Sequence, residues 1–269
     1  TKFLSKGEEV TEITIPNGVT SIGKNAFAGC TSITKVIIPN TVTSISQGAF
    51  MNCTNLTTIE FETGINISEI PDDFCYNNIE LSNIVIPEKI NKIGRRSFKN
   101  TNIQSLTIPN NVQIIGISAF EGSKITNLTL NDGVTTLKQN AFRFIKAKKI
   151  VIPDTVVSVE NTVFNGCENL ESITLGKGIT RIPGYFISGC RNLSEVIVKG
   201  NITRIEDIAM QNNTKLTLEG IQGLNWKNVL YIGDSAFYSC TALKGKVTVN
   251  KACEINENAT PNCPLVITK

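Results

Sequence analysis

Apolar residues follow a pattern that returns about every 23 residues along the chain. Phenylalanines mark it best, because eight of them recur at intervals of 22 to 24 residues and three further positions continue the series. An internal repeat of this length predicts a stack of small units, each in contact with its neighbours, instead of one globular core. The repeat positions are Phe27, Phe50, Phe74, Phe98, Phe120, Phe142, Phe164 and Phe186, followed by Met210, Phe237 and Thr260.

Each repeat contains two apolar segments with different spacing. The first follows L-x-x-L-x-L, as in Leu56-x-x-Ile59-x-Phe61. Its alternating end predicts a short strand with one buried face, and a proline such as Pro87 often terminates it. The second follows V-x-x-I and leads into an Ala-Phe turn, as in residues 22–27 (IGKNAF). This segment is too short for a regular helix and predicts a single helical or 3₁₀ turn.

One unit cannot bury its own apolar face, but units stacked in register bury Ile on Ile, Leu on Leu and Phe on Phe. The pattern therefore predicts an α/β repeat fold: a solenoid of about eleven repeats of about 23 residues, built mostly of short parallel strands with single helical or 3₁₀ turns. We expect residues 1–269 to form a single solenoid domain, with an irregular insert around residues 219–231.

The combined motif, L-x-x-L-x-L-P followed by V-x-x-I-x-x-x-A-F-x-x-C, resembles the BspA-type leucine-rich repeats from about Val10 to Cys263. The resemblance implies a leucine-rich-repeat solenoid from a secreted or surface-anchored protein of a host-associated bacterium or parasitic protist. Adhesion to host matrix proteins is the activity associated with that family. We therefore expect an extracellular or cell-surface recognition module without catalytic activity, whose partner is a host or extracellular-matrix protein or a glycan.

A structural spacer that displays another domain and binds nothing itself is the alternative. Regular repeats and a surface of mixed charge suit that role as well. Departures from the repeat favour recognition, since inserts in a solenoid often carry function. Repeats at Phe98, Phe120 and Phe142 lose one residue, and residues 63–72 carry extra ones. The largest departure separates Leu218 from Ile232.

Composition excludes several classes of function. The chain has 26 Lys and Arg against 23 Asp and Glu, a net charge of +3, and shows no basic stripe, so nucleic acid is not an expected partner. No apolar stretch is long enough to span a membrane, and Thr1-Lys2-Phe3-Leu4 does not begin a signal peptide. Histidine is absent from the sequence, which removes Ser-His-Asp and Cys-His nucleophiles and most zinc sites. We expect no catalytic, cofactor or metal residues.

Six of the eight cysteines occupy one repeat position, just before the L-x-x-L-x-L segment. Asn77, Thr101, Ser123, Ile145 and Asn213 hold that position in other repeats, so it reads as a small, semi-buried packing site for a free thiol. Disulfides between adjacent repeats and a metal site are the open alternatives. Cys75 and Cys253 lie off this series. The six are Cys30, Cys53, Cys167, Cys190, Cys240 and Cys263.

Candidate binding residues come from the insert and from the outward strand positions on the concave sheet. Trp226 and Tyr231 are aromatic residues in or beside the insert, although Trp226 also suits a packing role over the broken stack. One outward column is rich in Thr and Val, which strand propensity alone can explain, and its candidates are Ile37, Glu60, Val85, Val151 and Ile197. Thr174 and Thr217 are among the threonines that hold the same column in other repeats. Neither residues 1–9 nor 264–269 read as a cap, so end-to-end or edge self-association is a further expectation.

Overall fold

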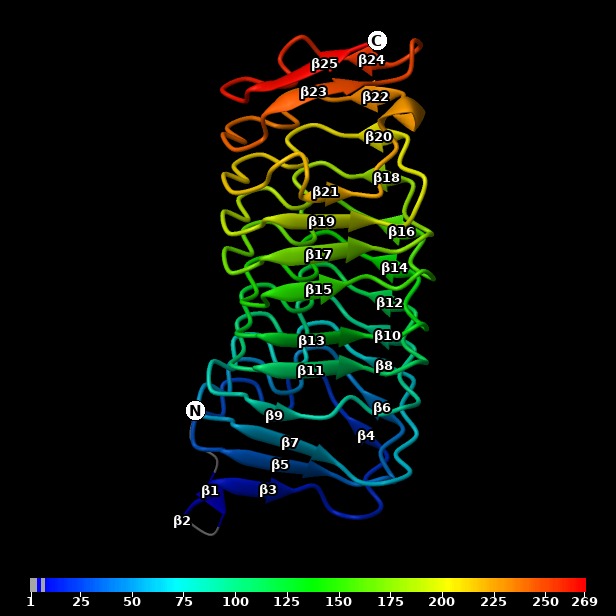
Figure 1. The fold of residues 1–269 in the computed structure, drawn as a ribbon. Coiled ribbons are helices and arrows are strands. Elements are labelled where there is room, and N and C mark those ends of the chain that lie inside the picture. The colour runs from blue at the N-terminus through cyan, green and yellow to red at the C-terminus, as the bar shows by residue number, and fades with distance from the viewer. Residues whose placement is uncertain (1–3, 6–7) are drawn as a thin grey trace.

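The computed structural model describes residues 4–5 and 8–269, and these form a solenoid of stacked coils, here called rungs (Figure 1). Thr1, Lys2 and Phe3, on which the expectation of no signal peptide rests, lie outside the described residues. Two short strands, β1 (Leu4–Ser5) and β2 (Glu8–Glu9), pair antiparallel before the first rung. The expected solenoid of about eleven repeats with short parallel strands is confirmed.

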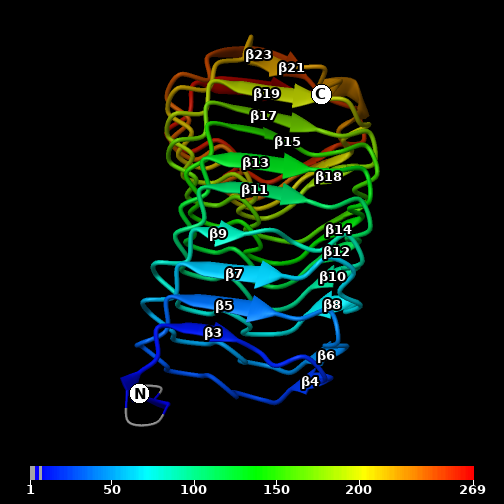
Figure 2. The ribbon, with the colours of Figure 1, turned by 90° about the horizontal axis from the view of Figure 1, so that it is seen from below.

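Most rungs contribute a strand of three or four residues to one side of the molecule, here called the long-strand face. Figures 1 and 2 show these strands following one another in chain order along that side. They are β3 (Glu12–Thr14), β5 (Lys35–Ile38), β7 (Thr58–Phe61), β9 (Asn83–Ile84), β11 (Ser105–Ile108), β13 (Asn127–Leu130), β15 (Lys149–Val151), β17 (Ser172–Leu175), β19 (Glu195–Val198), β21 (Ile221–Gln222), β23 (Gly245–Thr248) and β25 (Leu265–Thr268). The last of these shows that residues 264–269 hold a further strand, which pairs with β23.

A second row of two-residue strands forms another side, here called the short-strand face. Each strand forms the end of the V-x-x-I segment of its rung, and the Ile position is buried except in β6 and β24, where it is half-buried. They are β4 (Ser21–Ile22), β6 (Ser44–Ile45), β8 (Glu69–Ile70), β10 (Lys92–Ile93), β12 (Ile114–Ile115), β14 (Thr136–Leu137), β16 (Ser158–Val159), β18 (Arg181–Ile182), β20 (Arg204–Ile205), β22 (Tyr231–Ile232) and β24 (Glu254–Ile255).

Neither row is a continuous ladder. On the long-strand face, pairing is interrupted between β9 and β11, between β13 and β15, and between β21 and β23. On the short-strand face it is interrupted between β6 and β8 and between β16 and β18. Every boundary that is open on one face is paired on the other, as where β10 pairs with β12 beside the β9–β11 interruption. The stack can therefore open locally without coming apart.

The turns after the short strands differ from the predicted helical or 3₁₀ turns. In the first rung, the N–H groups of Asn25, Phe27 and Gly29 donate to carbonyls of the next rung, whereas that of Ala28 donates three residues back. Asn25 and Gly29 have φ values of 54° and 70°, and residues in this left-handed region cannot continue a helix. Each turn is thus a run of β-turns. The one helical element in the described part of the chain is the 3₁₀ helix η1 (Trp226–Asn228).

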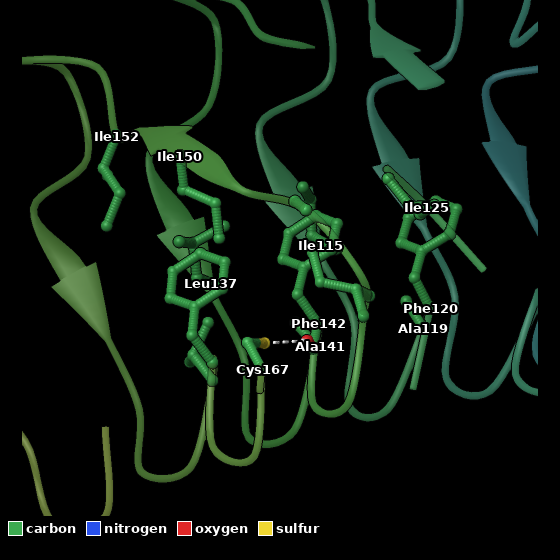
Figure 3. Packing of buried hydrophobic residues seen from close by; sticks show 14 of the residues in the cluster. Ile115, Ala119, Phe120, Ile125, Leu137, Ala141, Phe142, Ile150, Ile152 and Cys167 are labelled. Atoms are coloured by element: carbon green, nitrogen blue, oxygen red, sulfur yellow. Dashed lines mark hydrogen bonds between the residues drawn. The ribbon is translucent and has the colours of Figure 1, made fainter. Parts of the chain in front are cut away.

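The core between the faces is a column of phenylalanines surrounded by Ile, Leu and Val. Figure 3 shows Phe120 and Phe142 among Ile115, Leu137 and Ile150. Those two rings stack with centroids 5.4 Å apart and planes within 3°. Such a pair contributes about 0.5–1.5 kcal/mol beyond the burial of its apolar area. Repetition at every rung thus supplies the core that a single repeat lacks.

Two phenylalanines, Phe74 and Phe186, lie one residue out of register with the others. The N–H of Phe27 donates to the carbonyl of Ala49 in the next rung, and the N–H of Phe50 donates in the same way to Phe74. Phe74 therefore holds the alanine position, and Cys75 holds the phenylalanine position. Phe186 is displaced likewise, because the N–H of Phe164 donates to its carbonyl.

This shift corrects the prediction for the cysteine series around Cys75. The cysteine position in that rung belongs to Asn78 and not to Asn77, since the fully buried Asn78 accepts the backbone N–H of Cys53 through its side-chain oxygen. Asn77 instead has a φ of 61° and takes a left-handed turn position. The spacing of the phenylalanines does not reveal a shift of one residue, because a phenylalanine at either of two adjacent turn positions can place its ring in the core.

Candidate functional site

Three of the predicted binding residues lie on consecutive rungs near the N-terminal end of the long-strand face. Ile37 of β5 is half-buried and lies opposite Glu60 of β7 in the ladder. Lys35 donates to the exposed Glu60 across 2.8 Å, and this bond raises the pKa of Lys35. Val85 follows β9 on the next rung and is 81% exposed, the largest exposure among the large apolar residues of the described chain. These three residues form one outward group.

Val151 and Ile197 form a second group further along the same face. Both flank Thr174 in the ladder, since β15 pairs with β17 and β17 with β19. Val151 is 44% exposed and Ile197 is half-buried, whereas Thr174 between them is 6% exposed. The prediction that Thr174 is an exposed outward residue is thus wrong. Its side chain is buried because its two β-branched neighbours cover it.

Thr217 does not belong to the outward column. The strand of that rung is β21, in which Gln222 lies opposite Ile197. The insert explains the error: Met210 and Ile221 are eleven positions apart, whereas the corresponding Ile187 and Val196 are nine apart. Two of the extra residues therefore precede the strand and move it along the chain.

The sheet opens on the C-terminal side of the first group. β7 and β9 pair at only two positions, Thr58 with Asn83 and Ile59 with Ile84. No backbone hydrogen bond joins residues 82–88 to residues 104–108, all of which the structure describes. A cleft of about 990 Å³ occupies this opening, at the upper end of the range for ligand sites. Its walls are β7, the segment through β9 to Lys89, and the start of β11.

The cleft has an apolar floor and an acidic rim. Phe61 and Ile84 line it and are half-buried, although Ile59, the counterpart of Ile84 on the preceding rung, is 2% exposed. Glu60, Glu62 and Glu88 also line it, together with one cation, Lys89. This combination can hold an apolar side chain beside a positive charge.

Trp226 lies elsewhere and packs against the core. It begins η1, is half-buried, and packs on Phe237 with ring centroids 6.1 Å apart. The side chain of Asn225 caps η1 by accepting the N–H of Lys227. Trp226 therefore covers the core where the insert interrupts the long-strand face between β21 and β23.

Tyr231 lies in β22 on the short-strand face, away from the first group. The Arg204 guanidinium stacks 4.1 Å from the centroid of its ring, and its hydroxyl donates to Asp207 across 3.3 Å. Burial, followed by the Asp207 carboxylate, raises the pKa of Tyr231. With Tyr185 and others it lines a small cavity of about 240 Å³. The seven predicted residues thus do not converge on one site.

All eight cysteines are free thiols, and those in the cysteine position are packed into the core, apart from the half-buried Cys263. The Cys53 thiol donates to the carbonyl of Phe27, and Cys167 donates to Phe142 (Figure 3). Burial raises the pKa of Cys53 and of Cys240 to about 12, so both remain protonated at neutral pH. Within the described ranges, no three Cys, Asp or Glu side chains gather as metal ligands.

Sequence reasoning missed Phe61, Glu62, Ile84 and Glu88 as cleft residues. A signal was present in the repeat length: the aligned turn positions Cys75, Phe98 and Phe120 are 23 and then 22 residues apart. The segment before β11 is shorter than the one before β9, and at this point the two strands no longer pair.

Comparisons with known proteins agree with this architecture. The family profile described as "BspA type Leucine rich repeat region (6 copies)" matches residues 2–123, 91–217 and 219–268. No curated protein matches the sequence. No helix among residues 4–5 and 8–269 has the length and apolar character needed to cross a bilayer.

Several solved structures share the fold at low identity. A leucine rich cell surface protein from Faecalibacterium prausnitzii is 22% identical, with a TM-score of 0.64 over 95% of this chain and 80% of that one. A leucine-rich repeat protein from Eubacterium ventriosum is 23% identical, with a TM-score of 0.55 over 95% and 83%. The pneumococcal vaccine antigen PcpA is 16% identical, with a TM-score of 0.50 over 93% and 74%.

Family profile, repeat pattern and fold converge on one assignment. The matched segments cover almost the whole chain, and the strands they contain pair rung by rung as the repeat predicts. The chain belongs to the BspA-type leucine-rich repeat family.

Proposed function

We propose that this chain is a recognition module of a cell-surface or secreted protein, which binds a protein partner through its long-strand face and adheres to host or extracellular-matrix proteins. Family membership supports a surface protein-interaction module, and the Faecalibacterium prausnitzii structure is described as that of a cell surface protein. Solenoids of this kind present extended surfaces to their partners and are generally non-catalytic.

The cleft between β9 and β11 carries the proposal. A chain that served only as a spacer would gain from a closed ladder, in which each outward apolar residue is covered by the next rung. Here the ladder is open, Val85 is 81% exposed, and Ile84 and Phe61 are reached from solvent through the opening. Apolar groups held in a concave, acid-rimmed cleft are typical of a binding site.

The test measures binding of the purified chain to immobilised fibronectin and fibrinogen, followed by a panel of matrix glycans. Val85→Lys places a charge in the cleft, and Val151→Lys places the same charge on the second outward group as a matched control. We expect Val85→Lys to weaken binding at least tenfold and Val151→Lys to change it less than twofold, with both folds intact by circular dichroism.

Each other outcome has a definite meaning. An equal loss of binding in both variants would indicate that the partner contacts the whole long-strand face and not the cleft alone. Loss only on Ile37→Lys would place it on β5. Absence of binding to every protein and glycan would reject the recognition module in favour of the structural spacer.

A further inference from the structure

The opening between β9 and β11 leaves backbone groups of two strands without the partners that other rungs provide. Elsewhere on this face, neighbouring strands such as β17 and β19 pair at four consecutive positions. At the opening, β9 turns away from β7 after Ile84, and Pro87 follows three residues later with no N–H to donate. Strand edges exposed in this way are templates for pairing with another chain.

The two rungs remain joined outside the opening. On the short-strand face, β10 and β12 pair through Lys92 with Ile114 and Ile93 with Ile115. In the turns, the N–H of Phe98 donates to Ala119. Because the two rungs are tied on these sides, the opening is confined to the long-strand face.

The floor of the cleft favours a branched or aromatic side chain. Phe61 stacks on Phe74 with centroids 6.3 Å apart and planes at 20°, so its ring is held from behind. Ile84 lies beside it in the lining and is only half-buried. An extended peptide places alternate side chains on one face, so one of them can cover Phe61 and Ile84 while its neighbours point to solvent.

The rim favours a cation. Glu60, Glu62 and Glu88 line the cleft against Lys89, whose ammonium donates to Asn66 across 3.1 Å. Lys35 pairs with Glu60, and Glu62 accepts the backbone N–H of Asn40. Glu88 makes no ion pair with any residue that the structure describes. The rim therefore carries more negative than positive charge, although the whole chain has a net charge of +3.

We propose that the β9–β11 opening binds one extended, basic peptide segment of a partner protein, which pairs its backbone with the exposed strand edges and places a Lys or Arg against the glutamates of the rim. This inference rests on the proposed function and names the partner class of the same cleft. Backbone pairing supplies affinity that is independent of sequence, while the apolar floor and the acidic rim select the side chains.

The experiment uses three fluorescein-labelled octapeptides and fluorescence anisotropy. The first alternates Lys or Thr with Val. The second replaces each Lys with Glu, and the third keeps the basic side chains but carries N-methyl groups on alternate amides. We expect the basic peptide to bind at least tenfold more tightly than the acidic or N-methylated ones. Amide hydrogen exchange should slow in residues 83–86 and 104–108 only.

Variants locate the contact. The double variant Glu60→Gln, Glu88→Gln should weaken basic-peptide binding about fivefold and reduce its dependence on salt, whereas Glu171→Gln, at an exposed ion pair with Lys148, should leave both unchanged. Equal affinity for all three peptides, or protection outside the two segments, would overturn the inference.

The two proposals can fail separately. Capture of a matrix protein that is lost on Val85→Lys, with no binding of any peptide, would keep the recognition module and reject the extended-peptide partner. Peptide binding in the cleft without capture of any matrix protein would keep the basic-peptide site and reject adhesion to matrix.

Discussion

Phe74 lies edge-on to Phe50, with ring centroids 5.5 Å apart and ring planes at 89°. On the preceding boundary Phe27 and Phe50 are parallel within 4°. The rotation follows from the one-residue shift that puts Phe74 in the alanine position and Cys75 in the phenylalanine position. The same Phe74 ring supports Phe61 in the cleft. An irregularity in the core is thus connected to the opening on the surface.

Phe74→Ala should lower the free energy of unfolding by about 3–5 kcal/mol, because it leaves a cavity in the aromatic column. Adding Cys75→Phe should recover more than half of that loss, since it restores a ring at the regular position. Urea unfolding followed by circular dichroism measures both. A double variant no more stable than Phe74→Ala alone would show that the shifted position cannot accept the regular register.

Ile208→Asn should stabilise the chain by about 1 kcal/mol. Ile208 has a φ of 61°, a region that β-branched residues avoid and Asn tolerates. The matched control is Asn212→Ile, at the second left-handed position of the same turn, where φ is 62°. It should destabilise by a similar amount. Thermal unfolding measures the midpoint temperature of both variants. Midpoint shifts of the same sign would contradict the explanation by backbone strain.

Asp73→Asn should cost about 1–3 kcal/mol at pH 7. Asp73 is 3% exposed and accepts Arg96 Nε at 2.8 Å and Gln47 Nε2 at 3.0 Å. Burial opposes ionisation of this carboxyl, but the bonds from Arg96 and Gln47 outweigh it and lower its pKa. The stabilising contribution is therefore present above the ordinary Asp pKa of about 4 and is lost as pH falls through the lower folded value.

That pH dependence gives the measurement for Asp73. Unfolding at pH 7 and at pH 3 should show a gap between wild type and Asp73→Asn that narrows on acidification. Asparagine also tolerates the φ of 57° at this position, so backbone strain does not enter the comparison. A gap that widens toward pH 3 would contradict the depressed pKa.

Iodoacetamide at pH 8 should modify Cys263 well before Cys53 or Cys240. Cys263 is half-buried, whereas Cys53 and Cys240 are buried thiols whose pKa values are raised to about 12, and only the thiolate reacts. Mass spectrometry of peptide fragments gives the rate for each residue. Cys53 and Cys240 should react quickly only in denaturant, and equal rates in the native protein would refute their burial.

Trp226→Ala should destabilise the chain by roughly 1–3 kcal/mol without changing partner binding, because the indole packs on Phe237 over the core. Asn228→Ala, an exposed change within the same 3₁₀ helix, is the control. Binding assays on both variants decide between packing and recognition. Weaker binding by Trp226→Ala with unchanged stability would assign Trp226 to the partner surface instead.

The sequence alone determined the architecture because the repeat is local. Alternation in segments such as Leu56-x-x-Ile59-x-Phe61 dictates which side chains face inward, and the return of that pattern dictates stacking. Burial of the cysteine position also follows from the sequence, since Cys, Thr, Ser and Asn share it. Glycine and asparagine at positions such as Gly29 and Asn212 even mark the left-handed turn residues, a signal that a prediction of helical turns overlooks.

Only the tertiary structure decided where rungs pair and where they part. Hydrogen bonds between rungs join residues 19 or more positions apart, so a slide of one residue, as at Phe74, preserves the apolar pattern and still changes every partner. The same holds for the cleft. Val85 and Ile84 fit the repeat as well as Ile37 and Val36 do, but Val85 is exposed and Ile84 only half-buried where β11 does not pair with β9. Periodicity specifies which way a side chain faces, whereas contact between successive rungs determines what covers it.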